Sequence, residues 1–290
     1  MIPLSKIRQM RAEKERKIAR AAAVDSADEC TAEDPSKCRV HGIKALADTD
    51  EAEKNKKNPC GYKRLTEKEA VSAILDNADS LFCLQNGTVY MDSSVSDAER
   101  KDLSEALKFD SRAEVDYSRS IRTFGETLAE LNERFPNMKL PKLLSVIIGR
   151  PKKRKGVENP VAVTLKSVNE SNGKDRYIIM FANSTHKGGA TYNHGDARSD
   201  YDYVRHELGH VIAMANGFGD DEFWQSGVAC LGKQEFLSQM GKVSKCARED
   251  RPSGEAIAEC FSLYTSSDYD GRLDNRIEVF IRKHMTGEES

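Results

Sequence analysis

The sequence predicts an α+β fold in which helices surround a small mixed sheet. An amphipathic pattern over residues 113–135 indicates a long helix, and three short runs rich in β-branched and aromatic residues follow it. Two further apolar helices are expected near residues 201–216 and 253–264. A group of strands that precedes a group of helices is typical of α+β domains.

The first helix is expected to end at Pro136, because proline disfavours helical backbone in the residue before it. Strands are then expected at residues 144–148, 161–165 and 177–181, which are separated by polar or turn-forming segments. The later helix at 201–216 has a capping residue, Ser199 or Asp200, before it. The pair Asn216-Gly217 provides its stop signal.

This later helix carries the most specific motif of the chain, His206-Glu207-Leu208-Gly209-His210. Positions i and i+4 share one helical face, so His206 and His210 can bind one metal ion while Glu207 faces a water on it. Zinc lowers the pKa of such a water to about 7, and a neighbouring carboxylate can act as the general base. The alternative is a helix with two surface histidines. It is disfavoured because the surrounding residues are apolar and burial of three unpaired polar groups is costly.

A third zinc ligand is expected from the helix that begins near residue 253, which carries Glu255 and Glu259 on one face. Glu255 lies 255 − 210 = 45 residues beyond the second histidine. The metzincin extension HExxHxxGxxH is absent, so a downstream carboxylate rather than a third histidine is expected to complete the site. One carboxylate would bind zinc, and the other would hydrogen-bond to a ligand or to substrate.

With these two motifs the chain resembles gluzincin-type zincin peptidases, such as the catalytic domain of anthrax lethal factor and related domains encoded by bacteriophages and toxin systems. The resemblance implies that His206, His210 and Glu255 bind Zn²⁺, that Glu207 is catalytic, and that Glu259 supports the site. It further implies a zinc-dependent endopeptidase with a protein or peptide substrate and a zincin-like fold. The second motif departs from the family in having Ala256-Ile257-Ala258 in place of aromatic residues, and no Tyr shortly precedes Glu255.

In zincins the edge strand of the sheet lies over the cleft and can pair with an extended substrate. We expect residues 177–182 to be this edge, because they form the last strand before the metal-binding helix. The segment 183–199 is expected to be a loop beside the cleft. Within it, His194 or Tyr192 could donate a hydrogen bond to the oxyanion, although a solvated surface loop is the favoured interpretation.

Composition limits the other possibilities. A net charge of −2 gives no general reason to expect binding to nucleic acid or to an anionic membrane. The sequence has neither an apolar run long enough to span a membrane nor a secretory signal at its start, so a cytoplasmic or virion-associated protein is expected. The alternative function is a non-enzymatic virion-structural or interaction protein that retains a zincin fold and binds other virion proteins.

Three regions are expected along the chain. Residues 1–60 are highly charged and are expected to form a tail, residues 61–110 a small helical layer, and residues 111–290 the metallopeptidase domain. The tail contains an island of four soft or imidazole ligands that could close a structural zinc site, with free thiols as the alternative. These four residues are Cys30, Cys38, His41 and Cys60.

Overall fold

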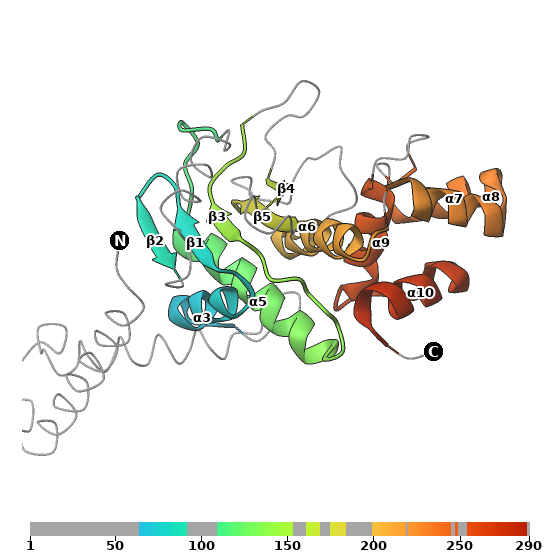
Figure 1. The fold of residues 1–290 in the computed structure, drawn as a ribbon, viewed down its shortest axis with the longest axis horizontal. Coiled ribbons are helices and arrows are strands. Elements are labelled where there is room, and N and C mark those ends of the chain that lie inside the picture. Colours follow the sequence, from blue (N-terminus) through green and yellow to red (C-terminus); the bar gives the residue numbers. More distant parts are fainter. Residues whose placement is uncertain are drawn as a thin grey trace, which may run out of the picture.

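The computed structural model describes residues 64–91, 109–152, 161–168, 175–183, 199–218, 220–244, 247–248 and 254–288. Within them the fold is α+β, as the sequence predicts, with one five-stranded mixed sheet and helices packed against it (Figure 1). None of the helices in these ranges is long and apolar enough to cross a membrane.

The sheet has the strand order β2-β1-β3-β5-β4. The three central strands β1, β3 and β5 run parallel, and β2 and β4 pair antiparallel at the two edges. The strands are β1 (Ser80–Cys83), β2 (Thr88–Met91), β3 (Ser145–Ile148), β4 (Ala162–Val168) and β5 (Asp175–Phe181). The three strands expected from the sequence are therefore confirmed as β3, β4 and β5.

The expected edge strand is wrong, because β5 lies inside the sheet between β3 and β4. β4 pairs antiparallel with β5 along its whole length, from Ala162 opposite Phe181 to Val168 opposite Asp175. The strand that comes earlier in the sequence is thus the outer one. β4 is the edge nearest the helix that carries the histidines, so any role of an edge strand over the site falls to β4.

The predicted helical layer at residues 61–110 is correct only for α3 (Glu67–Asn77), which begins with a capping box formed by Thr66 and Glu69. Leu81, which falls within this predicted helical layer, is fully buried in strand β1 instead. Ala78 ends α3 in extended backbone, and β1 then pairs with β3. These residues therefore build the same sheet as the later part of the chain. Residues 92–108 of the predicted layer lie outside the described residues.

The main core lies between one face of the sheet and the helices α3, α5 and α6. Alternate residues of β3 show this division: Val146 and Ile148 belong to the main core, and Ile147 belongs to a smaller cluster on the opposite face. Helix α5 (Tyr117–Arg134) is capped by Asp116, and its centre is buried against the sheet. It corresponds to the predicted helix at 113–135, shortened by the position of its cap.

The C-terminal part is helical. Helices α7 and α8, which were not predicted from the sequence, lie between α6 and α9 along the chain and pack on α9 (Figure 1). Phe236 of α8 packs between α7 and α8, in contact with Phe223 and Trp224 of α7. The helices of this part are α6 (Asp200–Ala215), α7 (Asp220–Leu231), α8 (Lys233–Val243), α9 (Glu255–Thr265) and α10 (Asn275–Ile281), followed by a π-helical turn (Arg282–Thr286).

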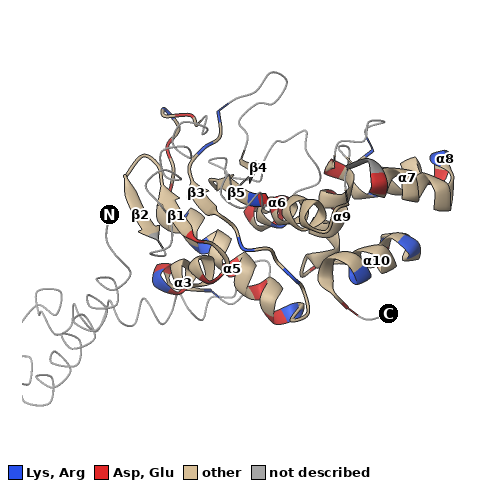
Figure 2. Ribbon diagram, in the orientation of Figure 1, with Lys and Arg blue, Asp and Glu red and all other residues tan. Residues whose placement is uncertain are grey.

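Charged residues lie mainly on the helices, where both signs are interspersed (Figure 2). The strands β1, β2 and β3 contain no charged residue, and those of β4 and β5 are Lys166, Asp175 and Arg176. Lys166 and Asp175 form an exposed ion pair at 2.8 Å. In the part of the chain that the structure describes, charges of both signs are therefore mixed along the helices.

Candidate metal centre

Helix α6 holds both histidines and is well defined at its two ends. Asp202, in its first turn, accepts a hydrogen bond from the backbone N–H of Ser199 at 2.9 Å, and Ser199 is the N-cap. At the other end the backbone N–H of Asn216 bonds to Ile212 O. The predicted helix at 201–216 is therefore confirmed to within one residue. Its buried residues are mostly apolar, and Arg205 and Glu207 are the charged ones among them.

Helix α9 brings the carboxylates to α6. It begins at Glu255, directly after Gly254, whose left-handed backbone (φ 69°) is the conformation that glycine adopts most easily. The two helices pack against each other, and the hydroxyl of Ser262 on α9 donates to the carbonyl oxygen of Asp202 on α6 at 2.9 Å. This contact fixes the register in which Glu255 and Glu259 face the histidines.

Three side chains converge on one point: His206, His210 and Glu255, with one candidate ligand atom each and all three atoms within 4.8 Å of one another. The Nε2 atoms of the two histidines are 3.0 Å apart. Glu255 places Oε2 at 3.1 Å from Nε2 of His206 and Oε1 at 3.8 Å from Nε2 of His210. His206 and Glu255, which are 49 positions apart in the sequence, thus belong to one compact group of candidate metal ligands.

These spacings suit zinc. With Zn–N bonds of about 2.0–2.1 Å, two nitrogens in a tetrahedral site lie about 3.3 Å apart. The measured separations of 3.0, 3.1 and 3.8 Å bracket that value. Two imidazoles and one carboxylate are also the donor set of catalytic zinc sites that keep a fourth position open. The chemistry and the geometry of these residues therefore fit Zn²⁺.

Glu259 lies on the other side of the His206 ring, with Oε1 at 3.2 Å from Nδ1. A carboxylate at this nitrogen fixes the tautomer of the imidazole, so that Nε2 presents its lone pair to a metal. Glu255 and Glu259, one helical turn apart, thus occupy different positions around the same histidine. Glu255 lies in the cluster of candidate ligand atoms, and Glu259 lies behind His206. The expected roles of Glu255 as ligand and of Glu259 as support for the site remain predictions.

Glu207 is buried, and its carboxylate points toward the edge strand β4. The hydroxyl of Thr164 lies 2.5 Å from Oε2 of Glu207 and 3.2 Å from its backbone oxygen. Thr164 was not predicted from the sequence. No local pattern marks it, because its significance comes from a contact between residues 43 positions apart.

The pKa values of the site follow from burial and from these neighbours. Burial alone would lower the pKa of His206, but hydrogen bonds to Glu255 and Glu259 raise it well above its ordinary value. Burial, and then the charge on His206, lower the pKa of His210 to about 4. Burial raises the pKa of Glu207, while the charge on His206 and the hydrogen bond from Thr164 oppose that rise.

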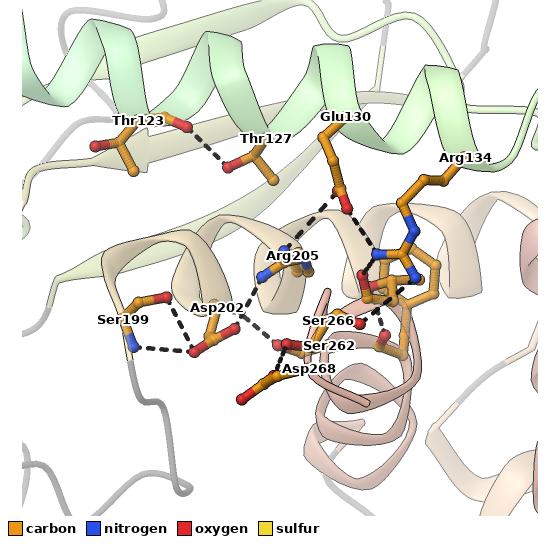
Figure 3. Close-up of polar contacts among 12 residues, drawn as sticks. Thr123, Thr127, Glu130, Arg134, Ser199, Asp202, Arg205, Ser262, Ser266 and Asp268 are labelled. Carbon is orange, nitrogen blue, oxygen red and sulfur yellow. Dashed lines mark hydrogen bonds and ion pairs between the residues drawn. The ribbon is translucent and has the colours of Figure 1, made fainter. Parts of the chain in front are cut away.

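A network of charged and polar residues connects α5, α6 and α9, with the buried Arg205 at its centre (Figure 3). Arg205, which is 1% exposed, pairs with Asp202 at 2.8 Å and lies 3.9 Å from Glu130 of α5. Glu130 in turn pairs with Arg134 at 2.6 Å. Arg134 also donates to the carbonyl oxygen of Thr265 at the end of α9, at 2.7 Å. The network therefore connects both helices of the candidate metal centre to α5.

Two other sets of candidate residues lie outside the described residues. They are the cysteine and histidine island at Cys30, Cys38, His41 and Cys60, and the loop residues His194 and Tyr192. The predictions of a second zinc site and of an oxyanion donor remain predictions.

Comparison with known proteins finds no relative of this chain. No protein-family model, no curated protein and no solved structure matches the chain. The functional interpretation therefore depends on the site itself.

Proposed function

We propose that the protein is a zinc-dependent endopeptidase of the gluzincin type, with a zincin-like catalytic region formed by the sheet and the helices α5, α6 and α9. The observation that carries this proposal is the convergence of His206, His210 and Glu255 beside the buried carboxylate of Glu207. A purely structural zinc site would have no need of such a base, which favours an enzyme over an interaction protein that retained the fold.

In this proposal each residue has a separate task. His206, His210 and Glu255 hold the metal, and Glu259 orients His206 through Nδ1. When bound, zinc would supply a Lewis acid and a water with a lowered pKa. Glu207 accepts the proton of the attacking water on its carboxylate and delivers it to the leaving amine.

The edge strand β4 provides the place for an extended substrate. Its paired side faces β5, and among the described strands none pairs with its other side. Unpaired backbone groups along an edge can accept a peptide as an additional strand. Thr164, in the middle of β4, touches Glu207, so a peptide on this edge would lie next to the base. The proposed substrate class is therefore an extended segment of protein or peptide.

The experiment that tests the proposal measures zinc content and cleavage together. Purified protein should hold one zinc ion in the residues from 64 onward and should cleave an unfolded protein such as reduced, alkylated casein. A chelator should remove both the metal and the activity, and added zinc should restore both. Protein that retains zinc but cleaves neither casein nor a mixed peptide library would favour the non-enzymatic alternative.

A further inference from the structure

Thr164 is the residue of the sheet in direct hydrogen-bond contact with Glu207. A separation of 2.5 Å between its hydroxyl oxygen and Oε2 is in the range of a hydrogen bond from a hydroxyl to a charged carboxylate. Threonine carries one hydroxyl proton, and the carboxylate oxygen is nearer than the backbone oxygen of Glu207, which is 3.2 Å away. The proton is therefore donated to the side chain of Glu207.

We propose that Thr164 is a positioning residue, which holds the carboxylate of Glu207 so that its other oxygen, Oε1, takes the proton of the attacking water. This inference rests on the proposed function. A free carboxylate on a glutamate side chain can rotate among several conformers, and reacting groups misplaced by about 1 Å lose much of their rate. A hydrogen bond that fixes one oxygen also fixes the direction of the second.

The position of Thr164 in strand β4 restricts the direction in which its hydroxyl can point. Threonine is branched at Cβ, so its χ1 angle is restricted, and it lies inside a strand whose backbone is paired opposite Ile179 of β5. The hydroxyl therefore has a direction set by the sheet rather than by a mobile side chain. Because β4 is also the proposed docking edge, a substrate on that strand and the base of the reaction would be held in one frame.

The test compares three variants of the zinc-loaded full chain. Thr164→Val removes the hydroxyl and keeps the shape, and we expect kcat to fall about 10–100-fold while KM and zinc content change less than about threefold. Thr164→Ser restores the hydroxyl and should recover most of kcat. Thr127→Val is the matched control. Thr127 is buried in α5 and its hydroxyl donates to the carbonyl oxygen of Thr123 at 2.8 Å, so this variant loses a similar hydrogen bond away from the site.

A second measurement does not need a peptide substrate. Acetohydroxamate chelates zinc and also offers acidic hydrogens to a neighbouring carboxylate. Its Kd should rise at least about threefold in Thr164→Val and stay within about twofold of wild type in Thr164→Ser and Thr127→Val. If the wild-type protein cleaves no peptide, the proposed function fails while this measurement still decides the role of Thr164.

The contribution of Thr164 should also depend on Glu207. In a Glu207→Gln background, Thr164→Val should change the residual rate and the acetohydroxamate Kd less than about twofold. Wild-type kcat and wild-type acetohydroxamate affinity in Thr164→Val would overturn the inference. A loss that Thr164→Ser fails to recover, or that Thr127→Val shares, would assign the effect to packing and overturn it as well. If Thr164→Val does not fold, Thr164→Ala takes its place.

Discussion

Helix α6 packs closely against helix α9 where Gly209 faces Ala258. A Cβ atom placed on Gly209 would lie 3.0 Å from Cα of Ala258 and 3.2 Å from the ring of Phe261. Gly209 stands between the two histidines, and Ala258 stands between the two glutamates. The absence of a side chain at this crossing is therefore what allows Glu255 and Glu259 to reach His206.

We expect Gly209→Ala to reduce zinc affinity at least about tenfold, because the added methyl group displaces α9 and moves Glu255 away from the histidines. Chelator competition measures this affinity. Gly241→Ala is the matched control, since Gly241 also lies in a helix and its added Cβ would meet the flexible side chain of Arg248 at 3.3 Å. Wild-type zinc affinity in Gly209→Ala would show that the close crossing is not needed for the metal site.

Part of the candidate site could be predicted from local sequence, and part depends on the packing of α6 against α9. The ends of α6 follow from Ser199 and Asn216, and the spacing of His206 and His210 follows from helical geometry, so these parts of the site were predictable from local sequence. Glu255 was predictable only as one of two carboxylates, through the resemblance of its motif to that of zincins. Its actual approach to the histidines depends on packing between distant segments.

The wrong predictions of secondary structure and strand order also arise because local sequence does not show contacts between distant segments. β1 and β2 are only four residues each, and Leu81 continues the apolar spacing of α3, so nothing local separates the strand from the helix. The order of strands in a sheet is set by pairing between segments, which explains why β5 was wrongly expected at the edge. Thr164 was missed for the same reason.

The two glutamates should differ in their importance for the metal. Glu255 faces the same Nε2 atom of His206 that faces His210, whereas Glu259 binds Nδ1 on the far side of the ring. Glu255→Ala should therefore lose more zinc affinity than Glu259→Ala, for which about 10–100-fold is expected. Chelator titration of both variants measures the order. The reverse order would exchange the roles of the two residues.

The number of protons released on zinc binding should depend on the pKa values of His206 and His210. The carboxylates around His206 overcome the effect of burial and raise its pKa, so we expect its imidazole to be protonated near pH 7 in the metal-free protein. His210, whose pKa is lowered to about 4, is already neutral. Because zinc requires neutral imidazoles, its binding near pH 7 should release about one proton, and its affinity should fall about tenfold per unit of falling pH.

Calorimetry of zinc binding in buffers with different ionisation enthalpies counts these protons. Below about pH 4 the slope should steepen, because His210 must then also lose a proton. A release near zero at pH 7 would contradict the raised pKa of His206. A release near two would contradict the lowered pKa of His210.

Substitutions in the polar network around the buried Arg205 should lower the free energy of unfolding by different amounts. Asp202→Ala leaves the buried guanidinium of Arg205 without its 2.8 Å partner, and we expect a loss of about 3–5 kcal/mol in the free energy of unfolding. Arg205→Met removes the buried charge itself and should cost clearly less. Arg119→Met, which breaks an exposed ion pair with Asp200, should cost at most about 1 kcal/mol. Denaturant unfolding measures all three, and an Arg205→Met loss equal to that of Asp202→Ala would contradict this account.

The most direct test of the central claim is peptide cleavage by Glu207→Gln, measured together with its zinc content. Glutamine keeps the size of the side chain and can still bond to Thr164, so zinc content and the unfolding midpoint should match those of the wild type. Cleavage should fall at least about 100-fold, because a general base typically contributes 10²–10⁴-fold. Glu222→Gln, at an exposed position of α7, should cleave like the wild type. Zinc-loaded Glu207→Gln that cleaves at the wild-type rate would contradict the proposed mechanism.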